Sequence, residues 1–232
     1  NADNVFLEGL TINNQVNVNS GSEDCVIDHC VVDYYNKSYG VIYLYSGSSN
    51  CTISNNTVIN TNGMYGIFAY ISPDNLIVNN SVEAKYGIYA YLSEGNIIKD
   101  NDIQGCLKFA SAPDTIVENN TVTPSYKKYA FYVHNCQNGT FVNNTITGSA
   151  YNYVMYLDSA PGSKFCNNRI SGGTTATIYA VSSVSQTSFY LNEISGTAAT
   201  LLYGKSTTTL NSVDPVTYVY NNNTYTGILG NH

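Results

Sequence analysis

The stretch TFVNNTI, residues 140–146, places an apolar residue two positions before a pair of asparagines and a β-branched residue two positions after it. Variants of this pattern occur along the chain: TISNNTV at residues 52–58, LIVNNSV at 76–82, TIVENNTV at 115–122 and KFCNNRI at 164–170. Counted on the second residue of the pair, the pattern returns after 19 to 31 residues, most often after 24. Such a repeat predicts a solenoid, in which each coil packs on the next.

The residues around each pair predict strands. β-branched side chains and apolar–polar alternation dominate, and helical periodicity is absent. One coil alone buries little, whereas stacked coils share a core. We therefore expect an all-β fold, a parallel β-helix of about ten coils forming a single domain over residues 1–232. The ten coils are marked by the second residue of the pair: Leu10, Cys30, Asn56, Asn80, Asn101, Asn120, Asn144, Asn168, Asn192 and Asn223.

The two positions of the pair have different predicted roles. The first lies in a tight turn that needs a left-handed residue, a conformation that asparagine tolerates. The second, which is asparagine in eight of the ten coils, can form a ladder of side-chain hydrogen bonds inside the rod. The pair is therefore interpreted as structural. The expected internal ladder comprises Asn56, Asn80, Asn101, Asn120, Asn144, Asn168 and Asn192.

A second repeated stretch, exemplified by GIFAYIS at residues 66–72 and GIYAYLS at 87–93, contains many tyrosines. Strand alternation directs its small and aliphatic residues inward and its aromatic residues outward. The outward rings have two interpretations: they cover the sheet as cross-strand pairs, or they bind sugar rings along an extended polymer. The predicted ligand-binding residues are Tyr43, Tyr45, Phe68, Tyr70, Tyr89, Tyr91, Tyr132 and Tyr156.

Polar residues interrupt this aromatic face near its centre. His134 and Asp158 share one column a single coil apart, with Lys108 and Tyr132 nearby. These four residues are the catalytic candidates, because such a cluster could abstract a proton or hydrolyse a glycosidic bond. The alternative is a polar spot on an exposed sheet.

Other polar positions give weaker signals. No metal centre is predicted, although Asp100, Asp102 and Glu118 could together hold Ca²⁺. Two exposed ion pairs, Lys99 with Glu118 and Arg169 with Glu193, are expected between adjacent coils. Cys25 and Cys51 align one coil apart, so their spacing permits a disulfide, but buried free thiols are the preferred interpretation. Longer loops are expected at residues 125–129 and 206–215.

The composition limits the partners. The net charge is −7 and only 11% of residues are charged, which argues against nucleic acid and favours neutral glycans over polyanionic ones. No apolar run approaches the length of a membrane span. Polarity resides in Tyr, Asn, Ser and Thr, as in secreted and cell-surface proteins that meet carbohydrate. The chain begins without a signal-peptide pattern or a recognisable capping helix, so we expect a segment of a larger surface protein.

The recurrent apolar-x-N-N-x-[VI] coil resembles the right-handed parallel β-helix proteins of the pectin-lyase-like superfamily. The sequence pattern, rich in Asn and Tyr, is most similar to that of adhesin-like surface proteins of methanogenic archaea. This resemblance, with the crossover preference, implies right-handed winding. The superfamily also contains pectate lyases and polygalacturonases. The catalytic Asp trio and Gly-His-Gly element of polygalacturonases find no match here. The catalytic Arg of pectate lyases finds none either, because the only arginine, Arg169, lies in an Asn turn away from the tyrosines.

Together these observations predict an extracellular or cell-surface module for adhesion or glycan binding, with a polysaccharide as partner and no cofactor. The alternative is a polysaccharide lyase or glycoside hydrolase that uses the central cluster.

Overall fold

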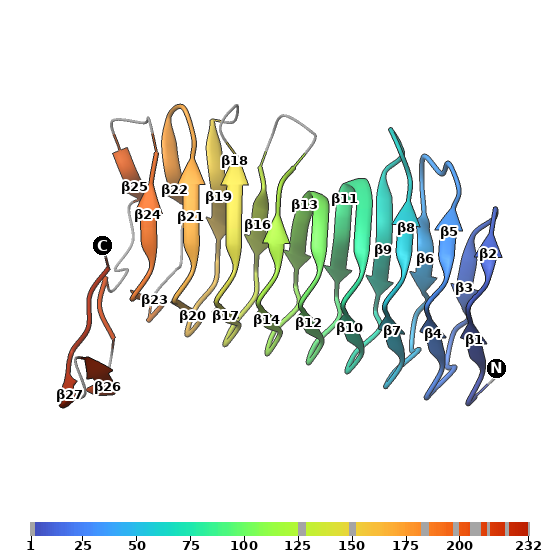
Figure 1. Ribbon diagram of the computed structural model, residues 1–232, viewed down its shortest axis with the longest axis horizontal. Helices are drawn as coiled ribbons and strands as arrows, with labels where there is room; N and C mark the ends of the chain where they lie inside the picture. The colour runs from blue at the N-terminus through green and yellow to red at the C-terminus, as the bar shows by residue number, and fades with distance from the viewer. Residues whose placement is uncertain are drawn as a thin grey trace.

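The computed structural model describes residues 3–124, 129–148, 152–181, 186–196, 200–204, 210–212, 214–220 and 223–231. They form an elongated rod of stacked parallel strands, with the N-terminus at one end and the C-terminus at the other (Figure 1). The predicted all-β parallel β-helix is therefore confirmed. No helix in this described part is long and apolar enough to cross a membrane.

One long face of the rod is a nine-stranded sheet in which every neighbouring pair is parallel. Each strand ends at the turn formed by the Asn pair or, after β1 and β4, by its equivalents Gly9–Leu10 and His29–Cys30. Equivalent residues pair from coil to coil; Ile77, for example, pairs with both Ile53 and Ile98. The strands are β1 (Phe6–Glu8), β4 (Val26–Asp28), β7 (Thr52–Ser54), β10 (Leu76–Val78), β12 (Ile97–Lys99), β14 (Ile116–Glu118), β17 (Thr140–Val142), β20 (Lys164–Cys166) and β23 (Ser188–Tyr190).

A 16-stranded sheet supplies the rest of each coil. The strands that follow the Asn turns are β2 (Thr11–Ile12), β5 (Val31–Asp33), β8 (Thr57–Ile59), β11 (Ser81–Tyr91), β13 (Asp102–Ala110), β15 (Thr121–Val122), β18 (Thr145–Gly148), β21 (Arg169–Gly172) and β24 (Glu193–Ser195). The third strand of each coil, which carries tyrosine in every coil except those of β3 and β13, is formed by the C-terminal parts of β11 and β13 together with β3 (Val16–Val18), β6 (Gly40–Leu44), β9 (Tyr65–Tyr70), β16 (Phe131–His134), β19 (Tyr153–Asp158), β22 (Ala176–Ala180) and β25 (Thr200–Gly204). We call these the tyrosine-rich strands.

The Asn pair behaves as predicted. The first residue is left-handed in every coil, with φ of 55° at Asn55 and 56° at Asn143. The second is exposed at Leu10 and buried from Cys30 to Asn192, and the side-chain oxygen of each ladder asparagine accepts hydrogen bonds from the preceding coil. All seven predicted ladder asparagines take part. The ladder begins where the Cys30 backbone N–H donates to Asn56 Oδ1 at 2.8 Å.

The tenth predicted coil is wrong. The segment around Asn223 forms an antiparallel pair of strands, β26 (Val216–Tyr220) and β27 (Asn223–Gly227), at the C-terminal end of the rod (Figure 1). Tyr220 pairs with Asn223, so two residues separate the strands, a connection that favours a hairpin. Asn231 instead extends the ladder, because its Oδ1 accepts from the Asn192 side chain at 2.8 Å. The described residues thus contain nine stacked coils.

The core lies between the two sheets and runs the length of the rod. Ile53, Ile77 and Ile98 from the first sheet are fully buried, as are Ile67 and Ile88 from the second. In the later coils Phe141, Phe165 and Phe189 stack at centroid distances of 4.4 and 4.6 Å. The predicted loops fall largely on residues 125–128, 206–209 and 213, which lie outside the described residues.

Candidate functional site

Side chains on the outer face of the tyrosine-rich strands form a second cluster, separate from the core, which we call the tyrosine face. Over β6, β9 and β11 its central column is Tyr43, Phe68 and Tyr89, stacked at centroid distances of 5.1 and 5.0 Å. These three rings point away from the core, as alternation predicts. They are nevertheless only 4 to 8% exposed, so the expectation that they form an open aromatic surface is wrong.

Neighbouring rings cover this central column. Tyr65 lies 4.8 Å from the Phe68 ring and 5.6 Å from the Tyr89 ring, and Tyr45 lies 4.5 Å from Tyr43. Burial raises the pKa of Tyr43 to about 12. The central column therefore supports the rings beside it and offers little surface of its own.

The second outward column is more accessible. Tyr45 is 41% exposed, and Tyr70 and Tyr91 are half-buried. Tyr70 and Tyr91 stack at 5.8 Å, and Tyr45 meets Tyr70 edge-on at 6.5 Å. Along three successive coils these rings form a strip that is open on one side and held by buried aromatic rings on the other.

The sequence analysis missed the covering rings Tyr39, Tyr65 and Tyr86. The signal was available, because each directly precedes a glycine that begins the repeated stretch. A Cβ on Gly66 would lie 2.4 Å from Val82 and one on Gly87 would lie 2.4 Å from Ile103. The glycines thus let the chain pass close to the core while the tyrosines fold over the outer face.

At the centre of the rod the aromatic column is replaced by a cation. The Lys108 ammonium lies 4.3 Å from the Tyr89 ring centroid, 4.9 Å from Tyr86 and 5.4 Å from Tyr132. Lys108 pairs with Tyr89 on one side and Tyr132 on the other in the strand register. Cation–π attraction to these rings holds the ammonium on the face.

A cavity of about 290 Å³ opens beside Lys108. It is lined by Lys108 and four tyrosines: Tyr86, Tyr129, Tyr132 and Tyr156. Tyr132 and Tyr156 stack almost parallel, with centroids 5.3 Å apart. Burial raises the pKa of both phenols, so they are hydrogen-bond donors at neutral pH. Tyr86 and Tyr129 were absent from the predicted site.

His134 and Asp158 lie in one column, as predicted, with Nδ1 of the histidine 3.0 Å from a carboxylate oxygen of the aspartate. Both side chains are partly exposed, at 45% and 27%. They do not line the cavity beside Lys108. The predicted catalytic cluster is therefore brought together in space but divides into two parts, a cavity containing Lys108 and Tyr132 and a neighbouring His–Asp pair.

The carboxylates suggested for Ca²⁺ do not converge. Among the described residues, the group of His, Cys, Asp or Glu side chains close enough to share an ion is Glu8, Asp28 and His29. Asp28 already accepts hydrogen bonds from Ser54 at 2.6 Å and Asn55 at 2.8 Å, and bonds to His29 at 2.6 Å. These bonds lower the pKa of Asp28 to about 2. Its carboxylate is thus engaged in a local network.

The predicted ion pairs between adjacent coils are present. Lys99 lies 3.6 Å from Glu118 and Arg169 lies 3.4 Å from Glu193. All four side chains are at least one-third exposed, so these pairs contribute little to stability. The six cysteines are free thiols.

A family model described as "Right handed beta helix region" matches residues 14–194. No curated protein matches the chain in sequence. Several solved structures match in fold. A point mutant of the periplasmic alginate epimerase AlgG gives a TM-score of 0.65 at 17% identity, covering 81% of this chain and 49% of that one.

Two further structures have the same fold at lower identity. An alginate lyase from Paenibacillus sp. gives a TM-score of 0.55 at 9% identity, covering 86% of this chain and 99% of that one. PfbA, a surface adhesin of Streptococcus pneumoniae, gives a TM-score of 0.52 at 12% identity, covering 97% of this chain and 68% of that one. The matches confirm the right-handed winding; the chain spans about half the length of the epimerase. The narrower resemblance to archaeal adhesin-like proteins stays a prediction.

Proposed function

Since the chain belongs to the right-handed β-helix family, we propose that it is an extracellular or cell-surface module that binds a polysaccharide along the tyrosine face. The main observation that supports this proposal is the strip of rings formed by Tyr45, Tyr70 and Tyr91 over three coils. Proteins of the same fold include an alginate epimerase, an alginate lyase and a surface adhesin, which makes an extended glycan a reasonable partner.

The geometry of the strip fits a polymer better than a small metabolite. Its ring centroids lie 6.5 and 5.8 Å apart on successive coils and form a shallow, open surface. Sugar C–H groups can pack on aromatic faces while phenol hydroxyls donate hydrogen bonds to sugar oxygens. The buried rings of Tyr43, Phe68 and Tyr89 fix the orientation of the strip, which lowers the entropy lost on binding.

The test is a glycan array followed by calorimetry, comparing the wild type with a Tyr45→Ser/Tyr70→Ser/Tyr91→Ser variant. Each stacked ring contributes about 1 kcal/mol, so the variant should bind at least roughly 10-fold more weakly. Tyr35→Ser is the matched control, because Tyr35 is 54% exposed and lies outside the tyrosine face. Equal binding by the wild type and the triple variant would reject the proposal.

The His134–Asp158 pair beside the cavity supports a second candidate function, cleavage of an acidic polysaccharide by β-elimination. Lys108 would neutralise a uronate carboxylate, and His134, held by Asp158 through Nδ1, would remove the neighbouring proton through Nε2. Tyr132 would donate a proton to the departing oxygen. Hydrolysis is less well supported, because it ordinarily uses two carboxylates and the cluster contributes Asp158 alone.

Ultraviolet absorbance of unsaturated ends, measured on uronic-acid polymers, separates the two functions. A pure binding module gives no product with any polymer. Turnover that is lost in His134→Ala and in Lys108→Met, while the Tyr45/Tyr70/Tyr91 variant keeps its rate constant at saturating substrate, would establish the second candidate. Reducing-end assays on neutral polymers test hydrolysis in the same samples.

A further inference from the structure

Cys25 and Cys51 occupy equivalent positions on adjacent coils, each immediately before a strand of the first sheet. The following residues, Val26 and Thr52, are register partners, and the Thr52 N–H donates to the Cys25 carbonyl at 2.8 Å. Adjacent strands are about 4.8 Å apart, which lies within the Cα separation that a disulfide spans. No other two of the six cysteines, all of them described, occupy such neighbouring positions.

The two thiols are also oriented alike. Cys25 Sγ donates to the carbonyl of Glu23 at 3.5 Å, and Cys51 Sγ donates to the carbonyl of Ser49 at 3.3 Å. Each sulfur therefore points toward the backbone two residues before it, so the sulfur atoms stack along the rod. The two thiols also act on each other, because Cys25 is among the groups that shift the pKa of the Cys51 thiol.

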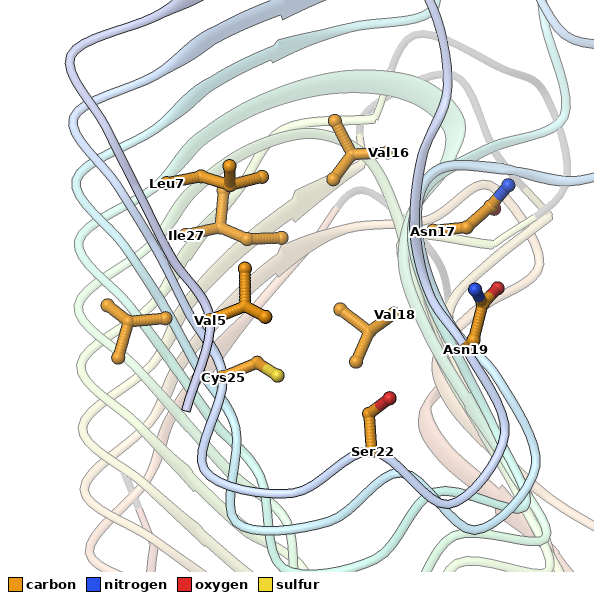
Figure 2. A pocket seen from close by; sticks show the side chains of 10 residues that line it. Val5, Leu7, Val16, Asn17, Val18, Asn19, Ser22, Cys25 and Ile27 are labelled. Carbon is orange, nitrogen blue, oxygen red and sulfur yellow. The ribbon is translucent and has the colours of Figure 1, made fainter. Parts of the chain in front are cut away.

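One of these sulfurs lines a cavity and is the more exposed of the two, since Cys25 is 5% exposed. Figure 2 shows Cys25 on the wall of an apolar cavity of about 120 Å³ at the N-terminal end, facing Val5 and Val18. Cys51 is fully buried one coil further in. Cys25 is thus the thiol that a reagent meets first, and Cys51 lies where it can attack the resulting sulfur.

From this arrangement we propose that Cys25 and Cys51 are a redox pair that closes into a disulfide between the second and third coils. The reaction is thiol–disulfide exchange with a small organic disulfide. The Cys25 thiolate attacks one sulfur of the oxidant, whose other half leaves as a thiolate, and a mixed disulfide forms. The Cys51 thiolate then attacks Cys25 Sγ and expels the second thiolate. Two protein thiols are oxidised, their two protons pass to the leaving thiolates, and one oxidant disulfide is reduced to two thiols.

The bond would join the second and third coils of the rod. Closing a loop of 26 residues restricts the unfolded chain and ties these two coils together. Burial raises the pKa of the Cys51 thiol to about 11, so the second step should accelerate as pH rises toward that value. This inference is independent of glycan binding.

The experiment exposes the full chain to hydroxyethyl disulfide and then counts thiols in denaturant with a maleimide reagent. The expected result is a fall from six thiols to four, a mass lower by two hydrogens, and a Cys25–Cys51 peptide in the digest. The thermal midpoint should rise by about 5 °C or more and return on reduction.

Three variants define the pair. Cys25→Ser and Cys51→Ala should each keep all five remaining thiols or stop at a reversible mixed disulfide, without the thermal shift. Cys106→Ala, which removes a buried thiol elsewhere, should still lose two thiols and gain stability. Six intact thiols in the wild type, a mixed disulfide that never resolves, or a bond between other cysteines would each overturn the proposal.

Discussion

The side-chain oxygen of Asn168 accepts two hydrogen bonds from Asn144, one from its backbone N–H at 2.9 Å and one from its side-chain amide at 3.0 Å. The same Asn144 amide also reaches the carbonyl of Val117 in the preceding coil at 2.9 Å. One buried residue therefore joins three coils. This arrangement, repeated along the rod, explains why asparagine recurs at the ladder position.

Replacing Asn144 by leucine should lower the free energy of unfolding by roughly 3 kcal/mol, because buried donors and acceptors above and below lose their partner. Among them is the Asn120 backbone N–H, which donates to Asn144 Oδ1 at 3.0 Å. Chemical denaturation measures the change. The control is Asn143→Gly, at an exposed left-handed position that glycine also adopts. A larger loss in the control than in Asn144→Leu would contradict the ladder account.

Asn231→Ala should loosen the last coil without unfolding the rod. Asn231 accepts the Asn192 N–H at 3.1 Å and donates to the Phe189 carbonyl at 2.9 Å, which ends the ladder. Hydrogen exchange of the Asn192 amide should become roughly 10-fold faster, since its protected state loses a hydrogen bond. Mass spectrometry of the peptide over 187–196 provides the readout. Asn211→Ala, at an exposed position, should leave this exchange rate unchanged.

Phe165→Ala should cost about 4 kcal/mol, the largest loss expected for a core position, because it leaves a cavity between two stacked rings. Phe165 is fully buried between Phe141 and Phe189. Phe165→Leu keeps most of the volume and should cost less than half as much. Denaturant midpoints with unchanged slopes would support this comparison; equal losses in the two variants would indicate that the ring stack is not tightly packed.

Acid should destabilise the protein in part through Asp28, whose pKa is lowered to about 2 by bonds from Ser54, Asn55 and His29. A carboxylate with a depressed pKa contributes stability that is present above its ordinary value of 3.8 and is lost as pH falls through about 2. The thermal midpoint of Asp28→Asn should therefore lie below the wild type above about pH 4 and converge with it toward about pH 2. Asp33→Asn, at an exposed position on β5, is the control. A gap that stays constant across this range would argue against the assignment.

Much of the candidate site was accessible to sequence reasoning. The columns of Lys108, Tyr132, His134, Tyr156 and Asp158 follow from alternation along each strand and registry between coils, and the structure places them as expected. The division of the cluster was missed, because it depends on how the side chains of Tyr86 and Tyr129, which directly precede the repeated stretch, pack around Lys108. Rotamers and ring packing decide which polar side chains share a cavity.

The sequence by itself determined the solenoid, the strand register and the asparagine ladder. Each is dictated by a local pattern that recurs at nearly constant spacing, so any parallel stacking of equivalent strands brings Asn144 beside Asn120 and Asn168. Only the tertiary structure decided that Tyr43, Phe68 and Tyr89 are buried, since their cover comes from rings such as Tyr65 on neighbouring coils. It also decided the structure of the C-terminal segment, where the apolar-Asn pattern around Asn223 is compatible with a further coil but forms a hairpin. Asn223, the marker of the predicted tenth coil, lies in the hairpin, and Asn231 extends the ladder beyond Asn192.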